Sequence, residues 1–243
     1  MKPPKTDTLF LTLRLFSATG GIEKVCMAAG KALYELSGEQ VNKRVKIFSL
    51  YDETEEVNPI YFPAQVFLGF GKQRLKFLLA AIKQGSNSRM VILSHVNLVT
   101  VGFAIKLFSP KTKLFLIAHG IEVWRNFPGW KKMMLAKCDQ ILPVSDFTKK
   151  KMMQLYNLPE EKFTILNNCL DPFLPPAQQQ PKDENLLMRY GIDANDKVLF
   201  TLTRLAGNEG YKGYDKVINA IHFLKEKYPG IKYLLVGKYD AIE

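Results

Sequence analysis

Cysteine is scarce in this sequence, and several motifs that define a chemistry are missing. The three cysteines, Cys26, Cys138 and Cys169, lie far apart and form no CxxC pair. An odd number at this spacing excludes a disulfide framework and indicates a reducing compartment, the cytoplasm. The sequence also has no zinc-finger spacing and no clustered Asp or His arrangement, so we expect no metal ion.

Long hydrophobic runs are missing as well. The uncharged stretch between Arg89 and Lys106 is interrupted by His95 and Asn97. It is also shorter than the ~20 apolar residues that a membrane span needs. The first sixteen residues contain Arg14 and no small-residue cleavage site follows them, which favours a first strand over a signal peptide.

Positive charge is in excess. The chain has 34 Lys and Arg residues against 23 Asp and Glu residues, a net charge of +11. This balance favours nucleic acid, an acidic membrane surface or phosphorylated substrates as partners. Because no aromatic-rich RNA-binding motif occurs, we expect no nucleic-acid partner. A salt titration against DNA or RNA tests that alternative.

Strand patterns alternate with helix patterns along the first two thirds of the chain. This alternation predicts an α/β fold, a doubly wound parallel sheet with helices on both faces and right-handed crossovers. We expect residues 51–71 to be irregular, because they contain two prolines and two glycines. The expected strands are 8–15, 45–50, 90–94, 113–118, 140–144 and 163–166, and the expected helices are 22–36, 72–83, 98–108, 124–137 and one beginning at Ser145.

A proline-rich segment divides the chain. Residues 171–185 contain four prolines and three consecutive glutamines and show no apolar period. After this segment the strand and helix patterns restart and then stop at Glu243. We therefore predict a first domain at 1–170, an interdomain linker at 171–185 and an incomplete second α/β domain at 186–243.

The expected helix 72–83 has an apolar face and several basic residues elsewhere. Leu75, Leu78, Leu79 and Ile82 repeat at helical spacing. A helix that lies on a membrane surface has this pattern. An ordinary amphipathic helix of a basic protein has it too, so both interpretations remain open.

Two glycine-containing connections follow strands and precede helices. Gly20 and Gly21 follow the first strand, and Arg204 and Lys212 lie between an expected strand at 198–203 and a helix from Tyr214. Open α/β sheets bind ligands beyond the carboxyl ends of their strands, and helix N-termini favour anions. An Arg and a Lys at this position predict a diphosphate site without a metal. The alternative is that both side chains are simply solvated on a loop and bind no ligand. The glycine pair is not a GxGxxG motif, which leaves a nicotinamide cofactor little support.

His119 follows an expected strand and is a candidate site residue. Without further information, a structural histidine that bonds backbone groups is the alternative. His95 lies at another strand end and His222 lies within a helix, so they are weaker candidates. Ser145 is expected to cap a helix, because no GxSxG motif surrounds it.

Four segments occur in an order that resembles a known family. They are GGIEKV at 20–25, AHGIEVW at 118–124, ILPVSDFTKKKM at 141–152 and TRLAGNEGYKGYDKVINAI at 203–221. They resemble the glycine turn, the central His-Gly segment, the serine and basic helix, and the Arg…Lys-Gly donor motif of the GT-B glycosyltransferases, specifically glycosyltransferase family 4. Members of this family transfer a sugar from a nucleotide-sugar with retention of anomeric configuration. The four segments span almost the whole chain.

The resemblance implies a role for each candidate residue. Gly20 and Gly21 would offer backbone amides near the donor phosphates or the acceptor, and His119 would line the cleft beside the reacting sugar. Arg204 and Lys212 would hold the diphosphate and stabilise it as it leaves. Neither a cofactor nor a metal is implied. The implied partners are a nucleotide-diphosphate sugar and a glycan or lipid-linked acceptor of polysaccharide or lipopolysaccharide biosynthesis, at the inner face of the membrane.

The resemblance stops where the chain stops. Family members continue into a second half-domain in which two glutamates, separated by seven residues, bind the donor. We therefore expect this chain to be a fragment with reduced or no activity. A non-catalytic module that binds an acceptor glycan, a lipid or a partner is the alternative, and acceptor binding without nucleotide binding would favour it.

Overall fold

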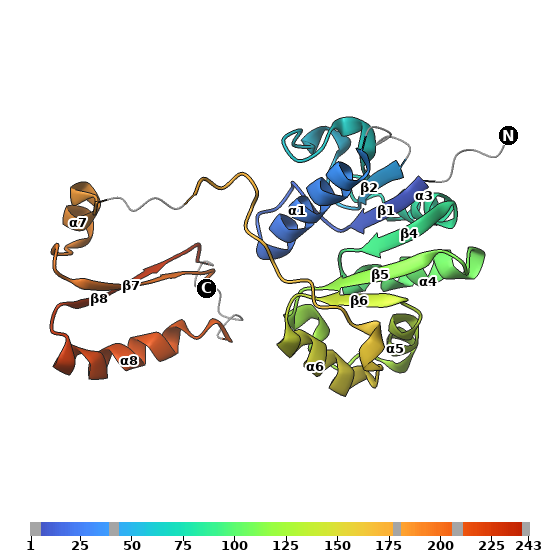
Figure 1. Cartoon of the computed structure of the whole chain (residues 1–243). Coiled ribbons are helices and arrows are strands. Elements are labelled where there is room, and N and C mark those ends of the chain that lie inside the picture. The colour runs from blue at the N-terminus through green and yellow to red at the C-terminus, as the bar shows by residue number, and fades with distance from the viewer. Residues whose placement is uncertain (1–5, 39–43, 177–180, 206–210, 240–243) are drawn as a thin grey trace. The chain divides into compact units, whose positions relative to one another are not determined.

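The computed structural model describes residues 6–38, 44–176, 181–205 and 211–239 (Figure 1). The chain forms two compact units, Met1–Leu174 and Pro175–Glu243. The division falls within the proline-rich segment 171–185. The start of that segment belongs to the first unit because the Tyr61 hydroxyl donates a hydrogen bond of 2.6 Å to the Asp171 carboxylate.

Unit 1 contains a six-stranded sheet in the order β3-β2-β1-β4-β5-β6, and its strands lie side by side in Figure 1. Each neighbouring pair is parallel. The sheet and its helices confirm the predicted α/β fold with a doubly wound parallel sheet. The strands are β1 (Thr6–Thr12), β2 (Val45–Ser49), β3 (Phe67–Gly69), β4 (Ser88–Leu93), β5 (Lys113–Ala118) and β6 (Gln140–Pro143).

Helices cover both faces of this sheet. Side chains alternate between the two faces of a strand, so Leu9 and Leu11 of β1 enter one core while Phe10 enters the other. Helix α1 contributes Cys26 to the Phe10 core, whereas α3, α4, α5 and α6 contribute to the other. The helices are α1 (Gly21–Leu36), α3 (Arg74–Ser86), α4 (Val99–Phe108), α5 (Gly129–Ala136) and α6 (Asp146–Tyr156), with short 3-10 turns η2 (Thr54–Glu56), η3 (Ala64–Val66), η4 (Val96–Leu98), η5 (Ile121–Val123) and η6 (Glu160–Lys162).

Three expectations about single elements were wrong. The segment 51–71, expected to be irregular, contains the three-residue edge strand β3. The expected strand 163–166 contributes only one bridge, between Phe163 and Ile141, within the described residues. The expected helix 124–137 begins at Gly129, because the preceding Pro128 is its N-cap in an extended conformation.

Helix α3 packs only half of the expected face, Leu78 and Ile82, against the core. Phe77 and Ala81 are buried against the core, whereas Leu75 and Leu79 remain 68% and 61% exposed. The two inward residues are four positions apart, as one helical stripe requires. Helix α3 therefore presents two leucines to solvent.

Unit 2 is a small parallel βαβ arrangement preceded by a short helix. Its elements are α7 (Glu184–Tyr190), β7 (Lys197–Leu202), α8 (Tyr214–Lys227) and β8 (Ile231–Val236), and β7 pairs with β8 in parallel. Ile231 is buried, but Phe200, Leu202 and Phe223 remain exposed. Two strands and two helices thus bury much less apolar surface than the sheet of unit 1.

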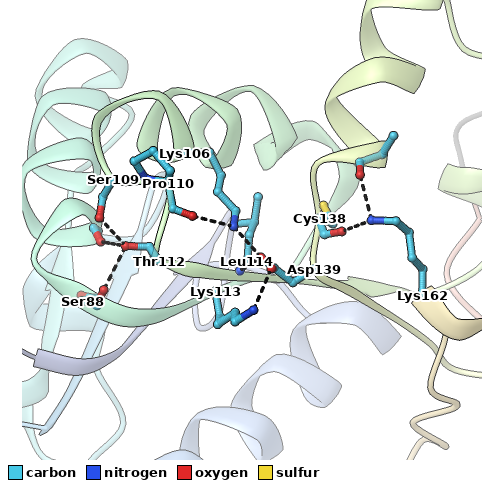
Figure 2. A network of polar contacts seen from close by, with 12 residues as sticks. Ser88, Lys106, Ser109, Pro110, Thr112, Lys113, Leu114, Cys138, Asp139 and Lys162 are labelled. Atoms are coloured by element: carbon cyan, nitrogen blue, oxygen red, sulfur yellow. Dashed lines mark hydrogen bonds and ion pairs between the residues drawn. The ribbon is translucent and has the colours of Figure 1, made fainter.

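A polar network closes the amino-terminal edge of the unit 1 sheet (Figure 2). The Asp139 carboxylate, just before β6, accepts from Lys106 Nζ at 2.7 Å and from the Leu114 amide at 2.8 Å. Lys162 Nζ donates to the Cys138 carbonyl at 2.7 Å. These bonds join α4, β5 and the start of β6. They lie at the edge of the sheet opposite the carboxyl ends of its strands. They satisfy backbone groups where the chain enters the strands.

In the part of the chain that the structure describes, no helix has both the length and the apolar character needed to cross a membrane.

Candidate functional site

The strand order reverses between β1 and β4. The chain proceeds from β1 to β2 and β3 on one side, and from β4 to β5 and β6 on the other. In open α/β sheets the crevice beyond the carboxyl ends of such a pair is the ligand site. A cavity of about 270 Å³ lies there. Its lining comes from the ends of β1, β2 and β4 and the start of α1, as Leu13, Arg14, Ile22, Glu23, Tyr51, Ser94 and His95.

Asp52 anchors the connection between β1 and α1 from beneath this cavity. Its side chain is fully buried. Its carboxylate accepts from the backbone amides of Leu15 at 2.6 Å and Ser17 at 2.7 Å, and from Ser49 Oγ at 2.5 Å. Charge-assisted bonds to backbone amides are among the stronger hydrogen bonds. They fix the connection that carries the cavity wall and leads to the glycine pair.

Arg14 projects from this connection toward Tyr51. Its guanidinium carbon lies 5.0 Å from the centre of the Tyr51 ring, a cation–π distance. Stacking on the ring orders a long exposed side chain without using its edge donors. The cavity mouth therefore presents an oriented guanidinium.

The predicted glycine pair lies at the N-terminus of α1. Gly20 is the N-cap with extended backbone, and Gly21 is the first helical residue. A side chain on Gly20 would collide with the Glu23 carboxylate, whereas one on Gly21 would meet nothing within 4 Å. Open space at Gly21 leaves its backbone accessible to a ligand. Glu23 itself places a negative charge at this helix end.

His119 follows β5 directly and is held at both backbone and side chain. Its amide donates to Glu122 Oε1 at 2.5 Å, and its Nε2 lies 2.8 Å from the Ser94 carbonyl. Since a carbonyl only accepts, Nε2 carries the proton and a neutral ring has Nδ1 as an acceptor. Gly120 next to it has φ of 141°, a conformation that glycine adopts without strain. The turn thus sets the direction of the imidazole.

Both histidines at this edge favour the neutral form. Burial lowers the pKa of His119 below its ordinary value of 6.5, although the Ser94 carbonyl, Glu122 and Glu23 act to raise it. Burial also lowers the pKa of His95, and nearby His119, Lys131 and Arg125 lower it further against Glu122. His95 Nδ1 accepts from the Asn97 amide at 3.0 Å, which leaves its proton on Nε2. A neutral imidazole can both accept a hydrogen bond from a ligand and donate one to it.

Arg204 follows β7 and Lys212 precedes α8, at the two ends of the connection between these elements in unit 2. Both side chains are exposed. Lys212 Nζ lies 5.1 Å from the centre of the Tyr211 ring, and Gly213 caps α8 with φ of 74°. This is the predicted strand end followed by a helix start. Gly207, Asn208 and Gly210 of the same loop lie outside the described residues.

The structure thus groups the five predicted site residues in two sets. Gly20, Gly21 and His119 lie at the carboxyl edge of the unit 1 sheet, and Arg204 and Lys212 lie at the corresponding edge of unit 2. The roles assigned to them stay predictions.

The described residues hold no candidate metal site, and two of the three cysteines are buried. They contain no group of three or more His, Cys, Asp or Glu side chains that could hold a metal ion. Burial raises the pKa of the Cys26 and Cys138 thiols to about 12. Both therefore stay protonated at neutral pH and pack as small apolar side chains.

Sequence reasoning missed several residues of this edge. Arg14, Tyr51 and Asp52 come from the two connections after β1 and β2, which the strand order brings together. Glu122 and Glu23 each had a local signal: Glu122 lies three residues after His119 in the segment AHGIEVW, and Glu23 lies three residues after Gly20 in the segment GGIEKV. No comparable signal marks the other three residues.

Comparisons with known proteins bear on the fold. The sequence matches no protein-family model, and no curated protein matches it. Among solved structures, HepE of Anabaena in complex with UDP and glucose is 16% identical with a TM-score of 0.64, and the match covers 97% of this chain and 62% of that one. HepE in complex with UDP is 13% identical with a TM-score of 0.60, covering 97% and 70%. A glycosyltransferase from Rickettsia africae is 14% identical with a TM-score of 0.56, covering 96% and 68%.

These matches show a shared fold. The chain has the Rossmann-like α/β architecture of these solved structures along nearly its whole length. It spans 62% of the HepE chain in the UDP and glucose complex.

Proposed function

We propose that the protein is a hexosyltransferase-type glycosyltransferase of family 4. It transfers a sugar from a nucleotide-diphosphate sugar to a glycan or lipid-linked acceptor with retention of configuration. The observation that carries the proposal is the placement of His119 and the glycine pair beside a cavity at the strand-order reversal, on a fold that also holds UDP in HepE.

In this proposal the unit 1 edge binds the acceptor and the reacting sugar. His119 Nδ1 accepts from a sugar hydroxyl, because Nε2 is engaged by Ser94. The Gly21 backbone lies in open space and donates to the ligand from the first turn of α1. Residues held this way need little rearrangement when the substrate binds.

In unit 2, Arg204 and Lys212 bind the donor diphosphate. As the sugar leaves, negative charge develops on the diphosphate, and cations already in place stabilise that charge in the transition state. Neither a metal nor another cofactor enters this scheme, since Arg and Lys supply the positive charge. The nucleotide-sugar is a co-substrate.

The acceptor is proposed to be membrane-associated. Helix α3 exposes Leu75 and Leu79 among basic residues at 72, 74, 76 and 83, and the whole chain carries +11. Apolar and cationic side chains on one exposed helix suit the surface of an anionic bilayer. We place the protein in the cytoplasm, peripheral at the inner face of the membrane.

Donor binding is tested by calorimetric titration of UDP, GDP and their hexose conjugates into the 243-residue chain. We expect one nucleotide to bind, and Arg204→Ala to weaken it by about tenfold or more, since a charge-assisted hydrogen bond contributes about 1.5–3 kcal/mol. Arg189→Ala is the matched control, because Arg189 is an exposed arginine of α7 that stacks on Tyr190. The Arg189→Ala variant should bind the nucleotide with the same affinity as the unmodified chain.

The alternative function is a non-catalytic module that binds an acceptor glycan, a lipid or a partner through unit 1. The cavity at β1 and β4 is consistent with that function too, because it lies wholly within unit 1. Binding of a glycan with no binding of either nucleotide would favour the module and contradict the transferase proposal.

A further inference from the structure

Two cations share one aromatic ring beside the candidate site. Lys131 Nζ of α5 lies 4.3 Å from the centre of the Phe127 ring, and the Arg125 guanidinium carbon lies 5.3 Å from the same centre. Both positions belong to the segment that follows His119 at the end of β5. The sequence therefore brings two like charges together at the functional edge.

Lys131 is also buried. Its exposed fraction is 9%, yet its Nζ has one hydrogen bond, of 3.1 Å to Asn97 Oδ1. Among the described residues, no carboxylate forms an ion pair with Lys131 or Arg125. The nearby Glu122 carboxylate is instead engaged by the His119 amide. Burial lowers the pKa of Lys131, and Arg125 lowers it further. Holding two unpaired cations together is costly, and a bound anion would remove that cost.

The Phe127 ring that both cations contact is rigidly supported. Phe127 is 5% exposed and stacks on Tyr156 at an interplanar angle of 6°. The Tyr156 hydroxyl lies 2.5 Å from the Val123 carbonyl and 2.9 Å from the Arg125 carbonyl. Helix α6 therefore fixes the backbone that carries Arg125. Arg125 itself is exposed, so its guanidinium can reach a ligand from this fixed backbone.

The cluster continues toward the cavity through η4. The exposed Asn97 uses its Oδ1 for Lys131, so its amide nitrogen remains a donor. His95 lies in the cavity wall, and its remaining proton is on Nε2. Lys131, Arg125, Asn97 and His95 thus provide donors of the kind that recognise an oxyanion.

We propose that Arg125, Lys131, Asn97 and His95 form a subsite for an oxyanion, phosphate or carboxylate, carried by the acceptor. This assignment rests on the proposed glycosyl transfer and narrows its acceptor to an acidic glycan or a phosphorylated carrier. The donor diphosphate has its own cations in unit 2.

Tryptophan fluorescence reports directly on this subsite. The chain has two tryptophans, and Trp124 and Trp130 flank the cluster in sequence. The probes are inorganic phosphate, glucuronate and neutral glucose, titrated into the 243-residue chain at constant ionic strength set with chloride. We expect saturable responses to phosphate and glucuronate, and at least about tenfold weaker binding of glucose.

The decisive variant is Lys131→Met, which keeps most of the apolar stem and removes the charge. We expect this variant to bind phosphate and glucuronate about tenfold more weakly, or weaker still. It should also lack the rise in melting temperature that phosphate gives the unmodified chain. Lys132→Met, on the same helix, is the control and should stay within about twofold of the unmodified affinity. Because Lys131→Met removes an unpaired buried charge, the variant should fold at least as stably as the unmodified chain.

Two results overturn the proposal. One is the absence of a saturable phosphate or glucuronate response, or an equal response in Lys131→Met. The other is a loss of calorimetric UDP binding in Lys131→Met, which would assign the oxyanion to the donor. If the unmodified chain binds phosphate as expected but no nucleotide, the proposed donor chemistry fails while the oxyanion subsite stands.

Discussion

Asp139 gains contacts on folding that favour its charged form. Its carboxylate contacts two lysines and the Leu114 amide, and its side chain is 23% exposed. Burial raises its pKa, but the hydrogen bonds from Lys106, the Leu114 amide and Lys113 outweigh burial and lower it below the ordinary 3.8. The charged form is therefore stabilised by folding.

We predict that Asp139→Asn lowers the free energy of unfolding by about 1–3 kcal/mol at pH 7, since it leaves a partly buried Lys106 without its carboxylate. Urea denaturation measures this difference. Glu160→Gln is the matched control: Glu160 also pairs with a lysine at 2.7 Å, but its side chain is 71% exposed. An exposed pair contributes little, so Glu160→Gln should lower the free energy of unfolding much less than Asp139→Asn does.

The pH dependence of the Asp139 variant follows from the lowered pKa. A group whose pKa is lower in the folded state stabilises the fold fully above its unfolded pKa, and the stabilisation is lost as the pH falls. The difference between the unmodified chain and Asp139→Asn should therefore be constant above about pH 5 and shrink as the pH falls below 3.8. A difference that grows on acidification would contradict the assigned charge state.

At the scale of elements, the connection between β1 and α1 depends on Asp52. We predict that Asp52→Asn lowers the free energy of unfolding by about 1.5–3 kcal/mol, because an amide has one acceptor oxygen where the carboxylate has two. Amide hydrogen exchange at Leu15 and Ser17 should accelerate. Asp7→Asn is the control, since its ion pairs with Arg44 and Arg89 are exposed. Slow exchange at Leu15 in the Asp52 variant would contradict the anchoring role.

Helix α3 supplies a second prediction at this scale. The double variant Leu75→Ser, Leu79→Ser should sediment with anionic vesicles about tenfold less than the unmodified chain, because burying a leucine contributes about 1.5–3 kcal/mol. Leu107→Ser is the control, since Leu107 is 66% exposed on the neighbouring helix α4. Two results would count against a membrane-bound surface on α3. One is equal sedimentation of the unmodified chain, the double variant and Leu107→Ser, and the other is no sedimentation of the unmodified chain at low salt.

The elements that the sequence predicted are those with strong local patterns. Strands such as β5 are continuous apolar runs, and α1 has a clear apolar face, so both follow from spacing alone. The three-residue β3 is too short for such a signal, and it forms only because β2 offers it an edge. The outward face of α3 depends on where α4 packs, which sequence spacing does not specify.

The same distinction applies to the site. His119 and the glycine pair were predicted because each lies at a strand end within a recognisable segment. Arg14 and Asp52 were not, since Tyr51 is 37 residues from Arg14 and the Leu15 and Ser17 amides are 37 and 35 residues from Asp52. The Lys131 subsite depends on one ring, Phe127, that two cations and a tyrosine share, and no spacing rule anticipates that packing.

At the scale of the whole molecule, both units place basic or polar side chains where parallel strands end and helices begin. In unit 1 these are the ends of β1, β4 and β5, and in unit 2 the end of β7. The amino-terminal edge of the unit 1 sheet instead holds the network around Asp139, in which protein donors and acceptors bond to one another. We therefore predict that ligands bind at the carboxyl ends of the strands, and that the bonds at the amino-terminal edge of the unit 1 sheet only stabilise the fold.

The most direct test is a nitrogen-15 NMR titration of the 243-residue chain with UDP-glucose, with each amide followed separately. We predict that the largest shifts occur at Arg204, Lys212 and Gly213, where the strand β7 ends and helix α8 begins. No shift at any of these amides, or shifts confined to the amino-terminal edge of the unit 1 sheet around Asp139, would contradict binding of a nucleotide-sugar at the carboxyl ends of the parallel strands.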